Sequence, residues 1–301
     1  MKAVVLAAYG DVDKLVLRDV PDPEPGPSEV KVKVAAASIN PVDWKLRSGA
    51  LRSFMPLELP AILGRDVSGT VTGVGSGVTA FKPGDEVLGL VHHGYAEYVV
   101  EGLEGFARIP DGLDMQKAAA LPLVVLTGAQ LVEEATRPAK GEIVLVTGAV
   151  GGVGRAAVYA ARKLGARVIA GVRKKQKDEA RELGAEQVVA LDDEAEMARL
   201  PQLDAVADTV GGETTEKLLP KIRKGGSIGS VVGEPAGAKR RELRVKAMLA
   251  HPDSKRLREL AEAVGRGDLE IPVEKTFPLA QAGQAQKVAE KGGVGKILLV
   301  P

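Results

Sequence analysis

One glycine-rich turn constrains the fold of this chain more than any other segment. Residues 146–154 read Val-Thr-Gly-Ala-Val-Gly-Gly-Val-Gly, directly after an apolar run and directly before a helix-like stretch. Strand, glycine turn and helix in this order form the unit that opens a doubly wound parallel sheet. Glycine at 151 lets the backbone approach a pyrophosphate closely, and glycine at 154 lets the helix pack against the strand. The helix start also offers N–H donors to an anion. We therefore expect a dinucleotide site formed by Ala149, Val150, Gly151, Gly152, Val153 and Gly154, against the alternative that the turn serves packing only.

The surrounding sequence supports this α/β reading. From residue 141 to about 232, short apolar runs alternate with helix-like stretches, which is typical of a doubly wound parallel sheet. The first third of the chain differs, because short strand-like runs follow one another across Pro- and Gly-rich turns. That texture predicts a small antiparallel barrel or sandwich. The chain has 301 residues, enough for about two domains.

The end of the second expected strand indicates which dinucleotide binds. An NAD site usually places an acid there to hold the ribose hydroxyls, but no acid occurs before Asp178. The cations Arg173, Lys174 and Lys177 occupy the segment instead, and they suit a 2′-phosphate. Cations near the start of a helix interact unfavourably with its dipole, so we expect this cluster to have a function that offsets the loss of stability. We expect NADPH as the cofactor, and the alternative is a solvated basic face.

Composition excludes several other classes of function. Lys plus Arg number 41 against 40 for Asp plus Glu, so the balance gives no reason to expect nucleic acid or an anionic membrane as the partner. Cysteine is absent, which excludes disulfides and thiolate metal sites. Neither a secretory leader nor an apolar run of membrane-spanning length is evident. We expect a cytoplasmic protein without a metal.

Two patterns look catalytic and are better explained otherwise. Tyr159 and Lys163 have the spacing of the short-chain dehydrogenase pair, but they lie on the helix directly after the glycine turn, where that family does not carry it. Such a pair on a surface helix is common by chance. His92 and His93 are adjacent, and adjacent residues of a strand cannot both face one metal. We expect both motifs to be structural.

Taken together, the motifs resemble those of the medium-chain dehydrogenase/reductase superfamily, and within it the zinc-free quinone oxidoreductase branch. The resemblance covers essentially the whole chain. Besides the glycine turn, it rests on the segments 38–45, 63–69, 94–98, 126–127, 204–212 and 295–299. Zinc-dependent members carry Cys-x-x-Asp and Gly-His-Glu where this chain has Asn40-x-x-Asp43 and Gly64-Arg65-Asp66. The resemblance therefore implies a site without zinc.

The resemblance also implies an architecture. A GroES-like substrate domain would comprise residues 1–122 and 267–301, and a Rossmann NADPH-binding domain would comprise residues 123–266. The family's usual assembly is a homodimer, paired through edge strands such as 244–249.

Several further site residues follow. Asn40 and Asp43 resemble the family's polar residues on the substrate side of the nicotinamide, although Asn-Pro-Val-Asp is also a good helix start. Thr127 resembles a residue that positions the nicotinamide, and its alternative is a hydrogen bond within its own helix. Thr209, Val232 and Gly233 follow expected strand ends, where ligands of parallel sheets bind.

These expectations combine into one function. The chain should transfer a hydride from NADPH to quinones or other α,β-unsaturated carbonyls, with Asn40 or backbone N–H groups stabilising the oxyanion that develops. Two alternatives stay open: a non-enzymatic NADPH-binding protein, and a reductase of enoyl thioesters. Fold alone does not separate them.

Overall fold

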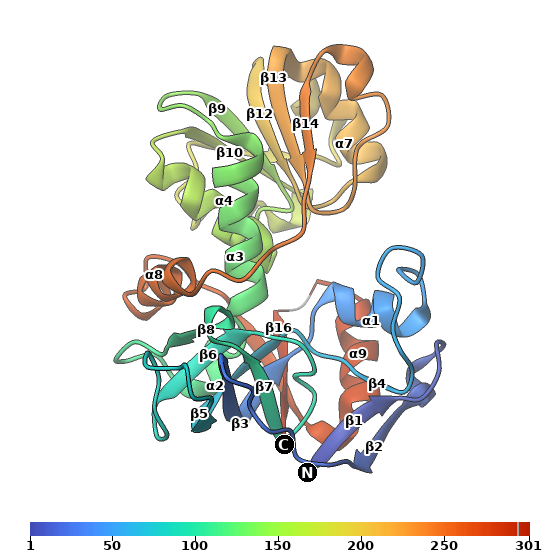
Figure 1. The fold of residues 1–301 in the computed structure, drawn as a ribbon. Helices are drawn as coiled ribbons and strands as arrows, with labels where there is room; N and C mark the ends of the chain where they lie inside the picture. The colour runs from blue at the N-terminus through green and yellow to red at the C-terminus, as the bar shows by residue number, and fades with distance from the viewer. Residues whose placement is uncertain (294) are drawn as a thin grey trace. The chain divides into compact units, whose positions relative to one another are not determined.

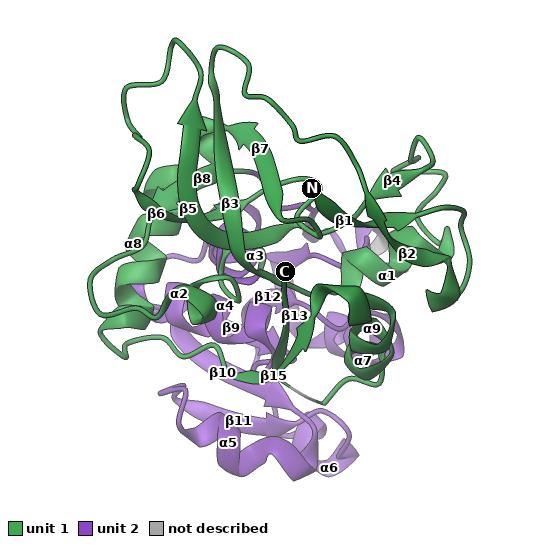
Figure 2. Ribbon diagram, turned by 90° about the horizontal axis from the view of Figure 1, so that it is seen from below, with its two compact units in different colours: residues 1–123, 252–301 green, residues 124–251 purple. Residues whose placement is uncertain are grey.

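The computed structural model describes residues 1–293 and 295–301, with the side chain of Arg240 left out. The chain forms two compact units (Figure 2). Unit 1 comprises Met1–Leu123 and Pro252–Pro301, and unit 2 comprises Val124–His251. Within the described residues, no helix is both long and apolar enough to span a bilayer.

Unit 1 is built on two sheets, labelled in Figure 1. The larger has the strand order β15-β16-β3-β5-β6-β8, with β7 also paired to β3, and the smaller has the order β2-β1-β4. All pairs are antiparallel except β15 with β16. The strands are β1 (Lys2–Leu6), β2 (Leu15–Asp19), β3 (Glu29–Ser38), β4 (Ala61–Ile62), β5 (Asp66–Val74), β6 (Glu86–Leu90), β7 (Tyr98–Gly102), β8 (Phe106–Arg108), β15 (Val273–Pro278) and β16 (Lys296–Val300).

The helices of unit 1 are short. They are α1 (Pro41–Ser48), α2 (Met115–Ala118), α8 (Ser254–Gly265), α9 (Ala282–Glu290) and the 3₁₀ turns η1 (Val12–Lys14), η2 (Leu103–Gly105) and η7 (Leu279–Gln281). Alternation along β3 shows why this sequence forms a sheet with one buried face. Val30, Val32 and Val34 are buried, whereas Lys33 between them is exposed.

Unit 2 is a parallel sheet with helices, as the glycine turn predicts. Its strand order is β11-β10-β9-β12-β13-β14, and every neighbouring pair is parallel. The strands are β9 (Ile143–Thr147), β10 (Arg167–Val172), β11 (Gln187–Ala190), β12 (Leu203–Asp208), β13 (Ile222–Ser230) and β14 (Arg244–Ala247). Consecutive strands run outward to one side from β9 and to the other from β12. The topological switch point, where such sheets bind ligands, therefore lies between β9 and β12.

Helices and short 3₁₀ turns connect the strands of unit 2. They are α4 (Gly152–Lys163), α5 (Lys177–Arg181), α6 (Glu194–Ala198), α7 (Gly212–Leu218) and the 3₁₀ turns η4 (Lys174–Gln176), η5 (Leu219–Lys221) and η6 (Lys239–Arg241). The helix α3 (Pro122–Gln130) continues as the π-helical segment η3 (Leu131–Thr136). Gly128 lets α3 pack tightly against α4, because a Cβ there would lie 2.6 Å from the Cβ of Ala156.

The second domain boundary differs from the one expected from sequence. The sequence places it at 266/267, whereas the compact units divide at 251/252, so α8 belongs to unit 1. The reason is the apolar face of α8. Leu257, Leu260 and Ala261 are fully buried, and the helix contacts β8 of the same unit. An amphipathic helix reveals in its sequence that it has a packing face, but not which sheet that face meets.

Candidate active site

The glycine turn forms a tight junction at the switch point of unit 2. Gly151 is the N-cap of α4, and it follows a turn in which Gly148 adopts a φ of 62°. A Cβ at Gly154 would collide with the carbonyl oxygen of Gly148, so glycine is required for the helix to pack there. A Cβ at Gly151 would meet only that same oxygen, at 3.3 Å. The backbone at Gly151 is therefore open to close approach, and this cradle fits the pyrophosphate of a dinucleotide.

A buried carboxylate ties together the strand ends beside this turn. Asp208, at the end of β12, accepts hydrogen bonds from the hydroxyls of Thr147 (2.9 Å), Thr215 (2.7 Å) and Ser230 (2.9 Å). It also accepts from the backbone N–H groups of residues 210 and 211. These bonds connect the carboxyl ends of β9, β12 and β13. Sequence reasoning did not single out Asp208. An acidic residue at the end of an apolar strand is the local pattern that would have identified it.

Among the expected cofactor residues, Thr209 lies within this arrangement. Its hydroxyl donates to the carbonyl of Thr147 at 2.7 Å, and its backbone N–H donates to the Thr147 hydroxyl at 2.8 Å. Val232 and Gly233 follow β13 in the adjacent loop, where Val232 is 42% exposed and Gly233 has a φ of 111°. Thr127 lies on α3 and is buried. Of the turn residues, Ala149 is fully buried.

The basic segment after β10 is partly neutralised by acids after β11. Lys177 Nζ contacts both carboxylate oxygens of Glu196, at 2.7 and 2.9 Å. Lys174 Nζ lies 3.3 Å from Asp193, in an exposed ion pair. Arg173 is exposed, and within the described part of the chain no carboxylate lies within 4.0 Å of its guanidinium. Arg173 can therefore contact an anion without first breaking an ion pair.

The second cluster lies in unit 1 and surrounds Asn40, just before α1. The Asn40 side chain donates from Nδ2 to Asp66 Oδ2 at 2.7 Å, and its Oδ1 accepts from Lys296 Nζ at 2.7 Å. Asp66 Oδ2 also accepts from the Ser38 hydroxyl at 2.6 Å and lies 3.2 Å from Lys296 Nζ. The backbone N–H of Leu123 donates to Asp66 Oδ1 at 2.7 Å. Asn40 therefore does more than cap a helix, because each polar end of its side-chain amide forms a hydrogen bond with a charged group.

Asp43 forms the other half of this cluster. It is fully buried, and its Oδ2 accepts from the backbone N–H of Asn40 at 2.7 Å and from the Tyr95 hydroxyl at 2.8 Å. Its Oδ1 has no hydrogen-bond partner among the described residues. Burial raises the pKa of Asp43 to about 6, against the opposing effect of its two donors. Burial likewise raises the pKa of Tyr95 well above its ordinary value, and the neighbouring Asp43 adds to this rise.

A cation of the protein itself lies between Asn40 and Asp66, at positions where the family resemblance implies metal ligands in the zinc-dependent members. Lys296 Nζ lies between Asn40 Oδ1 and Asp66 Oδ2, so an ammonium bridges the oxygens that a metal ion would need. Within residues 1–293 and 295–301, no three His, Cys, Asp or Glu side chains come together as a metal site. Zinc does not fit this donor set, because Asn40 and Asp66 already bind the Lys296 ammonium and Arg65 is cationic itself.

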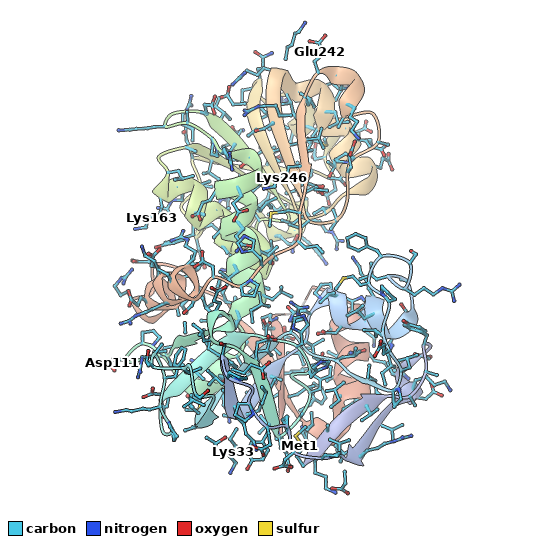
Figure 3. All side chains as sticks on the ribbon, in the orientation of Figure 1. Met1, Lys33, Asp111, Lys163, Glu242 and Lys246 are labelled. Atoms are coloured by element: carbon cyan, nitrogen blue, oxygen red, sulfur yellow. The ribbon has the colours of Figure 1, made fainter. Side chains whose placement is uncertain are left out.

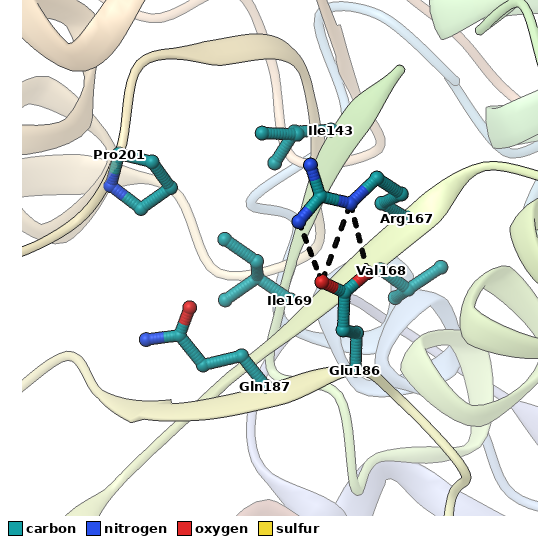
Figure 4. Close-up of a pocket in the computed structure, with 7 residues that line it drawn as sticks. All are labelled: Ile143, Arg167, Val168, Ile169, Glu186, Gln187 and Pro201. Carbon is teal, nitrogen blue, oxygen red and sulfur yellow. Dashed lines mark hydrogen bonds and ion pairs between the residues drawn. The ribbon is translucent and has the colours of Figure 1, made fainter. Parts of the chain in front are cut away.

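The motifs set aside on sequence grounds lie outside both clusters. Lys163, at the end of α4 (Figure 3), lies over the ring of Tyr159 with 5.4 Å between Nζ and the ring centroid. His92 pairs with Glu101 on the exposed surface, and the His93 ring bonds the carbonyl of Ile62. A shallow pocket in unit 2 lies at the opposite end of the sheet from the glycine turn, beside the starts of β10 and β11 (Figure 4). The ion pair of Arg167 with Glu186 borders that pocket. Because the pocket lies away from the glycine turn, we do not assign the dinucleotide to it.

Comparison with known proteins shows which family this chain resembles. Residues 26–130 match the alcohol dehydrogenase GroES-like domain, and residues 183–299 match the zinc-binding dehydrogenase family. The chain is 32% identical to a quinone oxidoreductase of Pseudomonas aeruginosa, across 100% of this chain and 99% of that one. It is 34% identical to the 2-methylene-furan-3-one reductase of Solanum lycopersicum, over 77% of this chain and 62% of that protein.

A solved structure agrees over the full length. The quinone oxidoreductase from Coxiella burnetii superposes with a TM-score of 0.90 and 31% identity, and the match covers 100% of this chain and 99% of that one. The parallel-sheet unit, the antiparallel unit and their order along the chain are those of one family of nicotinamide-dependent oxidoreductases. The chain therefore belongs to the medium-chain dehydrogenase/reductase superfamily, in its quinone oxidoreductase branch.

Proposed function

We propose that this protein reduces quinones and α,β-unsaturated ketones with NADPH, without a metal ion. A bound nicotinamide supplies the hydride. The protein's own part is to hold the acceptor and to meet the negative charge that develops on its oxygen. Relatives named as a quinone oxidoreductase and as a furanone reductase support this substrate class.

The arrangement of Asn40 carries the proposal. Its amide nitrogen has two N–H bonds, and Asp66 takes one of them. The second has no hydrogen-bond partner within the described residues, and although Asn40 is buried, we propose that this N–H is the donor to an acceptor oxygen. Such a donor is weaker than a metal ion or a proton donor, which enzymes generally use to reduce an isolated ketone. A quinone or an enone spreads the incoming charge over its conjugated system and can be reduced with this weaker support.

Arg173 supports the choice of NADPH. Its guanidinium is exposed and unpaired by carboxylates among the described residues, at the end of the strand where the ribose of a dinucleotide binds. A planar guanidinium binds phosphate with two parallel hydrogen bonds. Lys174 and Lys177 add positive charge to the segment, and both carry acid partners. The other residues of the cofactor site are those of the glycine turn, with Thr127, Thr209, Val232 and Gly233.

The proposed assembly is a cytoplasmic homodimer. β14 is the last strand of its sheet, so one of its edges is unpaired within the described residues. An unpaired strand edge can pair with the same strand of a second copy.

One side-by-side assay tests the function. A quinone, an enone, the matching saturated ketone and an alcohol are each offered with NADPH or with NADP⁺, and kcat/KM is compared. We expect turnover of the quinone and the enone, little or none of the saturated ketone, and no oxidation of the alcohol. Comparable kcat/KM for the saturated ketone would refute the mechanism. Cofactor binding without turnover of any acceptor would favour the non-enzymatic alternative.

A further inference from the structure

Lys296 is a buried cation whose contacts all converge on one short stretch of chain. Its side chain is 10% exposed, and burial lowers its pKa against the opposing effect of Asp66. The ammonium has three N–H donors, and three oxygens receive them. These are the carbonyl of Ile39 (3.2 Å), Asn40 Oδ1 (2.7 Å) and Asp66 Oδ2 (3.2 Å).

Strand pairing explains how a residue near the end of the chain reaches Asn40. β16 runs antiparallel to β3, with Leu298 opposite Ser38 and Leu299 opposite Ala37. The backbone N–H of Ile39 donates to the carbonyl of residue 297 at 2.9 Å and extends this register beyond the end of β3. Lys296 is the first residue of β16, so the register brings it beside Asn40. The same pairing that completes the sheet therefore completes the polar cluster.

The chemistry of the two charged partners fixes which way the Asn40 amide faces. Its oxygen and nitrogen ends have nearly the same shape, and only their hydrogen-bond partners distinguish them. An ammonium only donates, so it must face Oδ1. An ionised carboxylate only accepts, so it must face Nδ2. With Lys296 on one side and Asp66 on the other, the flipped amide would place donor against donor and acceptor against acceptor.

We propose that Lys296 is a positioning residue, which holds the Asn40 amide in the orientation that offers its free N–H to the acceptor oxygen. This inference rests on the proposed function, in which Asn40 contacts the acceptor. Lys296 does not itself reach the acceptor, because its three donors are already used. It also pairs its positive charge with the fully buried carboxyl of Asp66.

Without the Lys296 ammonium, we expect the Asn40 amide to lose its fixed orientation. In Lys296→Met, Oδ1 of Asn40 loses its donor and Asp66 loses its counter-charge. The amide would then no longer be held by a donor on its oxygen side, so other orientations of the amide would become accessible. We expect kcat for a quinone to fall about tenfold, less than the ~100-fold or greater loss typical of deleting an oxyanion donor outright. KM for NADPH should stay unchanged, because the hydrogen bonds of Lys296 go to Ile39, Asn40 and Asp66 and to none of the residues proposed to bind the cofactor.

A double-mutant cycle distinguishes positioning from a general structural effect. Lys296→Met is combined with Asn40→Ala, and Lys296→Arg tests rescue by a second cation. If Lys296 acts through Asn40, its removal should cost almost nothing further once Asn40 is alanine, and Lys296→Arg should recover part of the lost kcat. Lys33→Met, at an exposed lysine on β3, controls for loss of a surface charge. An equal loss in both backgrounds would overturn the proposal.

A spectroscopic measurement keeps the test independent of turnover. The side-chain amide of Asn40 gives a ¹⁵N-correlated NMR pair, assigned by its loss in Asn40→Ala. In the wild type we expect a slowly exchanging pair, and in Lys296→Met a shifted or broadened one. If the wild type reduces no acceptor, the proposed function fails while this measurement still decides whether Lys296 fixes the amide. An unchanged pair in Lys296→Met would refute the positioning role even if its rate falls.

Discussion

The buried carboxyl of Asp43 leads to a quantitative prediction about stability and pH. Its Oδ2 accepts two hydrogen bonds, yet burial raises its pKa from 3.8 to about 6 in the folded protein. Folding therefore disfavours the ionised form. The difference between 3.8 and about 6 corresponds to about 3 kcal/mol, since each pH unit is equivalent to about 1.4 kcal/mol.

The sign of the effect follows from which state binds the proton. Below pH 3.8 both the folded and the unfolded chain carry it, and Asp43 contributes no penalty. Between pH 3.8 and about 6 the unfolded chain releases the proton first, so the stability contributed by Asp43 falls as the pH rises. Above about pH 6 both states are ionised and the penalty stays constant. Asn at this position cannot ionise and avoids the penalty.

The substitution Asp43→Asn isolates the contribution of Asp43 ionisation to the free energy of unfolding. The free energy of unfolding of variant and wild type is measured by urea denaturation between pH 3.5 and pH 7.5. The variant minus wild-type difference should rise by about 3 kcal/mol toward neutral pH, because all other carboxyl groups cancel. Asp111→Asn, at an exposed carboxyl, controls for simple removal of a charge. A difference that is independent of pH, or that falls toward neutral pH, would refute the reasoning.

Three further predictions concern the cofactor and the metal. Changing Arg173 and Lys174 together to Ala should raise KM for NADPH at least about tenfold and leave KM for NADH nearly unchanged; equal losses would show that the cations serve structure only. Gly154→Ala should lower the free energy of unfolding by about 1–3 kcal/mol, because its Cβ collides with the Gly148 carbonyl, whereas Gly151→Ala should cost less stability while weakening cofactor binding in titrations. A similar stability loss in both glycine variants would contradict the packing argument. Treatment with a chelator should leave quinone reduction intact and elemental analysis should find well under one zinc per chain, and stoichiometric zinc lost together with activity would contradict this.

The parallel-sheet unit was predictable because its signal is local. Residues 146–154 combine a strand end, a glycine turn and a helix start within nine positions, and the spacing alone requires close backbone packing at Gly154. The strand order and its switch point then follow from short connections between alternating elements. The bounds were less predictable. The helix α3 ends at Gln130 and continues as a π-helical segment, and nothing in its apolar sequence marks that change.

The cluster around Asn40 could be predicted only in part, because it joins distant segments. Asn40 and Asp43 were identifiable from a local motif. Lys296 lies 256 residues from Asn40 and meets it only through the pairing of β16 with β3. Tyr95 reaches Asp43 from a loop 52 residues away. Pairing of this kind depends on the register of the whole sheet, which no local pattern of residues reveals.

Lys296 also explains why this site should favour conjugated acceptors. A metal ion in the same place could add a substrate oxygen to its coordination sphere and stabilise charge on it directly. An ammonium with three donors, each already bonded to Ile39, Asn40 or Asp66, has no such open position. Its charge is paired with Asp66 and its donors orient an amide, so in the proposed mechanism the acceptor oxygen meets neutral N–H donors rather than a cation. The remaining stabilisation must come from the substrate, and a quinone or enone supplies it by delocalising the charge that the hydride brings.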